Sequence, residues 1–166
     1  MAYHPNCGLL DPFGGAIDLK NKVLKTVGDP QVRFSEDALR VYRLFRFSAR
    51  LGFSIDPLTL QRAKEAIPLL PLLPVERIAK ELLLTLEQPF TFVLDLAVNQ
   101  GFFAHLGFHY ITKPEMVGEL PKRIPLRLAA FCFLTNTRPE TVSRTLKLSN
   151  ELAFCKSRIG EKPRTD

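Results

Sequence analysis

The stretch SEDALRVYRLFRFSAR, residues 35–50, decides the fold of this chain. It predicts one helix that starts at Ser35 as the N-cap and stops near Leu51-Gly52. Four arginines follow one another at steps of three, three and four residues: Arg40, Arg43, Arg46 and Arg50. At about 100° per residue these steps keep the side chains on one side of a helix. The other side is apolar and predicts a face turned to a core, made of Ala38, Val41, Phe45, Ser48 and Ala49 with Tyr42 and Leu44 at its edges.

The start of this stretch combines an acidic pair with the first arginine. Glu36 falls in the same sector as the arginines, and Arg40 lies one turn beyond Asp37. A carboxylate only accepts hydrogen bonds and a guanidinium only donates them. Together they complement a base edge with an amino group beside a ring acceptor, as in cytosine and adenine, and they oppose the carbonyl of uracil or guanine. The simpler interpretation is that the acidic pair favours the helix N-terminus and forms ion pairs on a solvated face.

The composition is that of a basic, globular chain. Of its 166 residues 46% are hydrophobic, which is room for one domain or two small ones. A net charge of +6 suggests a polyanionic partner. Cys7, Cys132 and Cys155 fit neither a metal site nor a disulfide framework, which predicts a reducing, cytoplasmic location. There is no signal-peptide pattern and no apolar run long enough to cross a bilayer, so no membrane partner is expected.

The first 34 residues are the only part that resembles a sheet. An apolar run over residues 9–15 ends in a Pro/Gly turn, residues 17–19 follow, and residues 22–27 predict a strand closed by a Gly-Asp-Pro turn. One or two short strands do not form a stable sheet alone, so their partners are expected from elsewhere.

From Ser35 onward helices are predicted. After the arginine helix they cover residues 57–66, 75–86, 91–100, 126–134 and 139–146, with a proline-rich linker over 68–74 and an aromatic loop over 101–114. The fold class is therefore mainly α, a helical bundle with a short N-terminal β segment.

Three groups of side chains outside the first helix suggest chemistry of their own. His105 and His109 have helical spacing but no Glu between them, which favours a structural role. An aromatic cluster could stack on RNA bases but is more typical of core packing; it consists of Phe102, Phe103, Phe108 and Tyr110. Basic residues of the second half either meet phosphates or form a solvated face; they are Lys122, Arg123, Arg127, Arg144 and Lys147.

Several ordered motifs over residues 1–86 carry a family resemblance. They are Met1-Ala2-Tyr3, Leu10-Asp11-Pro12-Phe13-Gly14-Gly15 with Asp18-Leu19, Thr26-Val27-Gly28-Asp29-Pro30, Arg33-Phe34-Ser35-Glu36-Asp37-Ala38-Leu39-Arg40 with Arg43 and Arg46-Phe47, Leu51-Gly52-Phe53, and Glu76-Arg77-Ile78 with Glu81-Leu82. Together they resemble the bacterial (class II) CCA-adding tRNA nucleotidyltransferases and their poly(A) polymerase relatives. After residue 86 the resemblance thins to a loose helical pattern.

The resemblance implies a division of the chain and a role for its first helix. Residues 1–34 would be the end of a nucleotidyltransferase head, 35–86 a neck that binds nucleotide and RNA, and 87–166 part of a helical body. Asp37 would accept from the amino group of CTP or ATP, Arg40 would donate to the ring acceptor, and Glu36 would orient Arg40. The product would be CCA at a tRNA 3′ end.

Further residues receive supporting roles from the same resemblance. Arg43 and Arg46 would brace the pocket or meet phosphate. Glu76 and Arg77 would support the helix that selects the base. Three residues resemble the hinge between head and neck, which lets the pocket change shape between C and A: Gly14, Gly15 and Asp18.

The largest departure from the family concerns catalysis. The family uses Mg²⁺ held by carboxylates of an Asp-x-Asp motif that precedes the segment beginning here at Met1. Asp11, Asp18 and Asp29 form no such motif, so no catalytic or metal-binding residue is predicted in this chain. The chain alone is expected to be inactive, and a separate polypeptide could supply the catalytic head.

Three alternatives remain open from the sequence. The chain could serve poly(A) addition, because the selecting pair accepts both C and A. It could be a non-catalytic RNA-binding module or half of a split enzyme. It could also be a helical scaffold whose arginines form only surface ion pairs.

Overall fold

The computed structural model describes residues 1–6 and 8–148, and over these residues the chain is mainly helical, as the sequence predicts. The helices are α1 (Gly15–Asn21), α2 (Pro30–Glu36), α3 (Leu39–Leu51), α4 (Pro57–Glu65), α5 (Val75–Leu86), α6 (Val93–Asn99), α7 (Glu115–Glu119), α8 (Ile124–Leu134) and α9 (Pro139–Thr145), with 3-10 turns η1 (Ile67–Leu72) and η2 (Ala104–Leu106). The strands are β1 (Ala2–His4), β2 (Gly8–Leu10), β3 (Val23–Leu24) and β4 (Ser54–Ile55).

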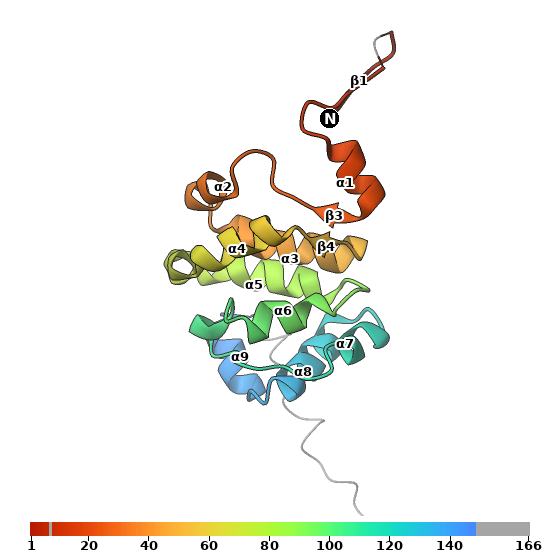
Figure 1. Cartoon of the computed structure of the whole chain (residues 1–166). Helices are drawn as coiled ribbons and strands as arrows, with labels where there is room; N and C mark the ends of the chain where they lie inside the picture. The colour runs from red at the N-terminus through yellow and green to blue at the C-terminus, as the bar shows by residue number, and fades with distance from the viewer. Residues whose placement is uncertain (7, 149–166) are drawn as a thin grey trace, which may run out of the picture.

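The helices stack in layers below a projecting N-terminal arm. Figure 1 shows α3 and α4 at one end of the stack, α5 and α6 in the middle, and α8 and α9 at the other end. The β1–β2 pair and α1 extend away from the stack. None of the described helices is long and apolar enough to cross a membrane.

Helix α3 is the centre of the core and packs chiefly against α5. The predicted apolar face is confirmed, because all seven of its residues from Ala38 to Ala49 are buried. The aromatic cluster is also mostly core: Phe102 and Phe103 contact Phe45 and Tyr42 with ring centroids 4.7 and 4.9 Å apart. Tyr110, in contrast, is 62% exposed.

The two small sheets differ from the sequence-based prediction. β1 pairs antiparallel with β2, and β3 pairs parallel with β4, so the partner of β3 comes from the loop after α3. The prediction was wrong for residues 17–19, which lie in α1, and too long for 22–27, where only Val23 and Leu24 are strand. The turn at Gly14, with φ of 70°, starts α1, and the Asp11 side chain caps it by accepting from the Gly15 and Ala16 N–H groups.

Two further departures follow later in the chain. The predicted linker over 68–74 is largely the 3-10 turn η1, and the short helix α7 lies within a stretch without a predicted helix. Gly52 ends α3 with a φ of 68°, and a Cβ there would meet the Phe90 ring at 3.1 Å. Glycine is therefore required where the end of α3 meets the loop before α6.

Arg127 is buried. The interpretation that the basic residues of the second half form a solvated face is therefore wrong for Arg127. It is 2% exposed, and within residues 1–6 and 8–148 its guanidinium donates only to backbone carbonyls. Nη1 bonds the oxygens of Leu86 and Gln88 at 2.8 Å each, and Nη2 bonds those of Gly118 and Leu120 at 3.0 and 2.7 Å. One guanidinium therefore ties the end of α5 to the last turn of α7 and the residues that follow it.

Candidate nucleotide-binding site

The candidate site lies at a break between two helices. The sequence predicts one helix from Ser35, but α2 ends at Glu36, Asp37 is extended, and α3 starts at Leu39. The prediction was wrong because the helix begins earlier: Asp29 caps it by accepting from the Gln31 N–H at 2.8 Å, and Pro30 occupies its first turn. Ser35 then lies inside α2, where its hydroxyl donates to the Gln31 carbonyl.

Asp37 organises this break with both its backbone and its side chain. Its backbone oxygen accepts from the Arg40 N–H at 3.0 Å, and Oδ1 accepts from the Leu39 N–H at 3.1 Å. Its second oxygen, Oδ2, lies 3.5 Å from Nη2 of Arg77 in α5. The carboxylate is thus fixed in place while 27% of the side chain remains exposed.

Arg40 is held by Glu36 and not by Asp37. Its Nη1 donates to Oε2 of Glu36 at 2.7 Å and to the Arg33 carbonyl at 3.0 Å. Arg33 also pairs with Glu36, at 3.1 Å. Hydrogen bonds from Arg40 and then from Arg33 hold the pKa of Glu36 below its ordinary value of 4.5.

Arg43 and Arg46 converge on a buried carboxylate that the sequence analysis did not single out as a site residue. Nε of Arg43 lies 3.4 Å from Oε1 of Glu81, and Nη1 of Arg46 lies 3.3 Å from Oε2. Oε2 is buried and makes no hydrogen bond in the described part of the chain, so Arg46 serves it through charge. The available signal was the position of Glu81 on the apolar face of α5, next to Leu82.

The two residues expected to support the selecting helix have different surroundings. Arg77 contacts Asp37, as described above. Glu76 instead pairs with Lys147, just after α9, at 2.7 Å. The remaining predicted residues lie on the arm: Gly14 and Gly15 at the start of α1, and Asp18 within it.

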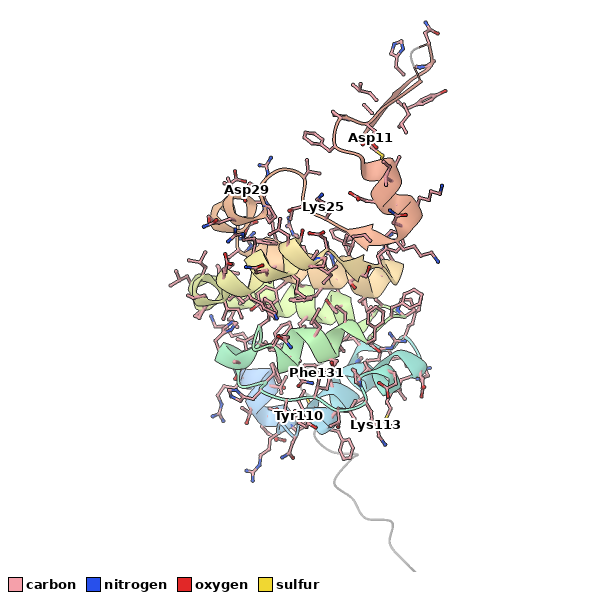
Figure 2. The ribbon with its side chains drawn as sticks, viewed as in Figure 1. Asp11, Lys25, Asp29, Tyr110, Lys113 and Phe131 are labelled. Carbon is pink, nitrogen blue, oxygen red and sulfur yellow. The ribbon has the colours of Figure 1, made fainter. Side chains whose placement is uncertain are left out.

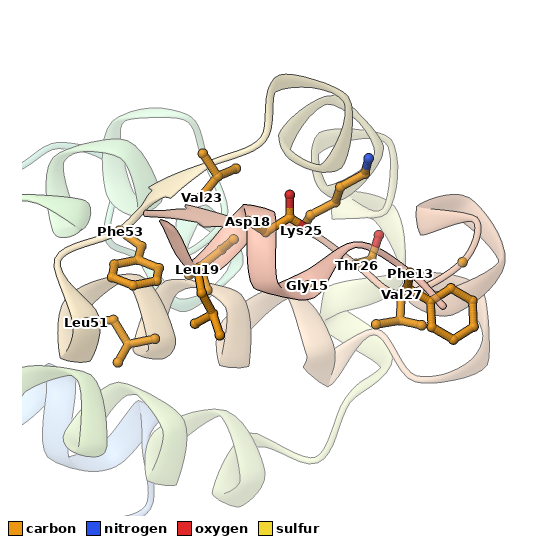
Figure 3. Close-up of a pocket in the computed structure, with 12 residues that line it drawn as sticks. Phe13, Gly15, Asp18, Leu19, Val23, Lys25, Thr26, Val27, Leu51 and Phe53 are labelled. Carbon is orange, nitrogen blue, oxygen red and sulfur yellow. The ribbon is translucent and has the colours of Figure 1, made fainter. Parts of the chain in front are cut away.

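A hollow of about 210 Å³ lies beside the arginines of α3. Its walls come from the segment after β3, from α2 and from α3: Leu24, Lys25, Thr26, Phe34, Arg40, Arg43, Leu44 and Phe47. A second hollow of about 410 Å³ lies on the other side of the same segment, toward α1, and Figure 3 shows Lys25 and Thr26 on its wall. The segment after β3 thus separates two depressions.

The described residues do not fit a magnesium site. Among residues 1–6 and 8–148 no three His, Cys, Asp or Glu side chains gather in a group that could hold a metal ion. Asp11 and Asp29 are both engaged in capping helices, and Figure 2 shows them well separated. The carboxylates of two-metal centres must instead hold ions about 3.5–4 Å apart.

Comparison with known proteins places this arrangement in a class and then in a family. No protein-family model matches the chain. Its fold is similar to the crystal structure of the Bacillus stearothermophilus CCA-adding enzyme in complex with CTP, with a TM-score of 0.80, 28% identity, and coverage of 92% of this chain and 40% of that one. It is also similar to a tRNA-processing enzyme with CTP, with a TM-score of 0.67, 25% identity, and coverage of 87% and 45%. The class is therefore defined by the fold that the chain shares with these two enzymes.

The curated relatives specify the family. The CCA-adding enzyme of Anoxybacillus flavithermus is 38% identical over 151 residues, which is 87% of this chain and 38% of the relative. That of Geobacillus sp. is 48% identical over 99 residues, 59% of this chain and 24% of the relative. The chain belongs to the CCA-adding enzyme family and spans less than two fifths of the length of these two relatives.

Proposed function

We propose that this chain forms the nucleotide-selecting part of an enzyme that adds CCA to the 3′ ends of tRNA, with CTP and ATP as substrates. Family membership supports the reaction class. The selecting role is supported by one observation: Asp37 and Arg40 each form an ion pair with a different residue. Asp37 pairs with Arg77 and Arg40 with Glu36, so neither is neutralised by the other.

Selection follows from the hydrogen-bond inventory of the two side chains. The Asp37 carboxylate accepts from the exocyclic amino group of cytosine or adenine, and the Arg40 guanidinium donates to the neighbouring ring nitrogen. Uracil and guanine place a carbonyl opposite the carboxylate, so one acceptor faces another. An unpaired buried polar group costs about 1–3 kcal/mol, which is enough for a preference of tenfold or more.

The other predicted residues would hold this pair in shape. Glu36 orients Arg40, and Arg77 fixes Oδ2 of Asp37. Arg43 and Arg46, braced by Glu81, form the basic wall that meets phosphate. Glu76 supports α5 from the side of Lys147.

The proposed division of the chain keeps the expected limits. Residues 1–34 belong to the head, residues 35–86 to the neck and residues 87–166 to the body, in the cytoplasm. The turn at Gly14-Gly15, with Asp18 beyond it, is the hinge between head and neck. A left-handed glycine followed by a short helix supports a change of direction there.

Catalysis requires groups that the described residues do not provide. Mg²⁺ would stabilise charge on the transferred phosphate in the intact enzyme, but the carboxylates that could hold it are not gathered here. We therefore propose that the chain alone transfers no nucleotide and that a catalytic head, in the same or a separate polypeptide, completes the site.

The test is incorporation of labelled CTP and ATP into tRNA that lacks its CCA end. The chain alone is compared with a chimera in which the region preceding the match in the Anoxybacillus flavithermus CCA-adding enzyme precedes Met1. The expected result is no incorporation by the chain and CCA synthesis by the chimera. Turnover by the chain alone would overturn the proposed inactivity, and addition of A alone by the chimera would favour poly(A) synthesis.

A further inference from the structure

Phe47 is an exposed aromatic residue on the wall of the hollow that also contains Arg40 and Arg43. It lies seven residues after Arg40 and four after Arg43, so the three side chains share one face of α3. Side chains on a helix lean toward its N-terminus, which directs the Phe47 ring toward the turn that carries Arg43. The side chain is 40% exposed although every neighbouring apolar residue of α3 toward the core is buried.

A cation lies over the ring of Phe47. The Arg46 guanidinium lies 4.9 Å from the ring centroid, a distance at which a cation attracts the face of an aromatic ring. Arg46 is in turn held by the buried carboxylate of Glu81. Arg46 therefore contacts both the buried carboxylate of Glu81 and the aromatic ring that lines the hollow.

The opposite wall has the chemistry of an incomplete binding site. The hydroxyl oxygen of Thr26 is buried and has no hydrogen-bond partner in the described part of the chain. The segment that carries it is anchored at both ends, since the Leu24 carbonyl accepts from the Asp56 N–H and the Val27 carbonyl accepts from Arg33 Nε. Lys25, on the same segment, also lines the hollow and adds a cation to it.

We propose that Phe47 is a stacking platform for a nucleobase in this hollow. The hollow, about 210 Å³, is smaller than the roughly 300–1,000 Å³ of pockets that enclose whole ligands, so it takes one ring system and leaves the sugar and phosphates at its cationic rim. Stacking is tolerant of base identity because every base has a π-face. Phe47 therefore contributes affinity, whereas selectivity rests on Arg40, which also lines the hollow, and on Asp37, which lies outside it. This inference rests on the proposed function.

The nucleobase belongs either to the incoming nucleotide or to the last nucleotide of an RNA, and one reporter separates the two sources. The chain has no tryptophan, so Phe47→Trp introduces a single fluorophore at the hollow. We expect CTP, or an RNA oligonucleotide ending in CC, to quench its fluorescence, and tripolyphosphate, which has no base, to leave it unchanged. Phe92→Trp is the matched control, because Phe92 is 49% exposed and lies outside the hollow.

A second measurement uses calorimetry to follow binding of the same ligands to the chain without an introduced tryptophan. Phe47→Leu should weaken binding by about tenfold, Phe47→Tyr should restore it, and Phe92→Leu should have no effect. The stacking role would be overturned if CTP bound without quenching the tryptophan at position 47 and Phe47→Leu kept the wild-type affinity. It would also be overturned if none of these ligands bound to the chain. Equal binding of CTP and UTP with quenching by both would instead retain the stacking role and contradict selection by Asp37 and Arg40.

Discussion

Glu81 is the residue whose surroundings are least expected from a local view of the sequence. It lies on the apolar face of α5 and is only 5% exposed, yet it is charged and faces two arginines of α3. A buried carboxylate is tolerated when cations compensate it. Its position therefore ties α5 to the arginine face of α3.

Replacing Glu81 tests this tie. Glu81→Gln keeps the volume but removes the charge, so Arg43 and Arg46 lose their common partner. We expect a loss of about 1–3 kcal/mol in the free energy of unfolding, because both arginines remain partly hydrated. Urea unfolding measures the change. Glu65→Gln, which breaks the exposed pair with Arg62, should cost much less, because solvent screens that pair; equal effects of the two variants would contradict the role given to Glu81.

The Glu36 carboxylate should remain ionised at unusually low pH. Its pKa is lowered by hydrogen bonds from Arg40 and Arg33, so the pair with Arg40 contributes stability above pH 4.5 that is lost only as the pH falls through the lowered value. NMR titration of the Glu36 side chain measures this pKa directly. In Arg40→Met the pKa should move up toward 4.5, and an unchanged value would show that Arg40 does not hold Glu36 in solution.

At the level of elements, the break between α2 and α3 shows where sequence reasoning succeeds and where it fails. The apolar period from Ala38 to Ala49 was readable because it depends only on helical spacing. The break could not be predicted, because the sequence offers two helix N-caps, one at Asp29-Pro30 and one at Asp37. The local pattern alone does not say which of them starts the helix. The consequence is functional, since Asp37 is a junction residue and not part of a continuous helix.

Arg127 is the corresponding case in the second half of the chain. Its sequence neighbours gave no sign that a charged side chain within an apolar helix would donate to the carbonyls of five residues. Arginine suits this role because its planar group carries five donors in fixed directions. The residue thus joins elements that the sequence separates by about 40 positions.

Removing the Arg127 side-chain donors should destabilise the body more than any surface change. Arg127→Met leaves buried carbonyl oxygens unpaired, and we expect a loss of about 2–4 kcal/mol. Arg127→Lys should recover little, because an ammonium group has three donors and no planar fork. Thermal unfolding checks both. Arg123→Met, at an exposed position four residues earlier, is the control, and a similar small shift for Arg127→Met and Arg123→Met would refute the clamp.

For the molecule as a whole, the mainly helical class and the family were accessible from the sequence, but the interior of the site was not. Helical spacing singled out Asp37 and Arg40, the family resemblance added Arg77, and the structure brings Asp37 and Arg77 together. The contact of Arg46 with Glu81 joins residues 35 positions apart and depends on how α3 crosses α5. Such a crossing is a property of packing, which one periodic stretch does not specify.

The basic character of the molecule gives a prediction about RNA. If Arg43 and Arg46 meet phosphate, the affinity for tRNA lacking CCA should fall steeply with salt, and Arg43→Ala with Arg46→Ala should weaken binding and reduce the salt slope by about one to two. Arg62→Ala, which removes an arginine paired on α4, is the matched control. Filter binding over a salt series measures both. Unchanged RNA binding in the double variant would favour a scaffold whose arginines only form ion pairs.

The central claim is that Asp37 and Arg40 select bases that carry an amino group. The most direct measurement is calorimetric binding of CTP and of UTP to the wild-type chain and to Asp37→Ala with Arg40→Ala. Asp37→Asn serves as a companion, because Asn can still accept from the Leu39 N–H and so preserves the start of α3. We predict at least a tenfold preference for CTP in the wild type, and none in the double variant or in Asp37→Asn. A double variant that still prefers CTP as strongly as the wild type would contradict the claim.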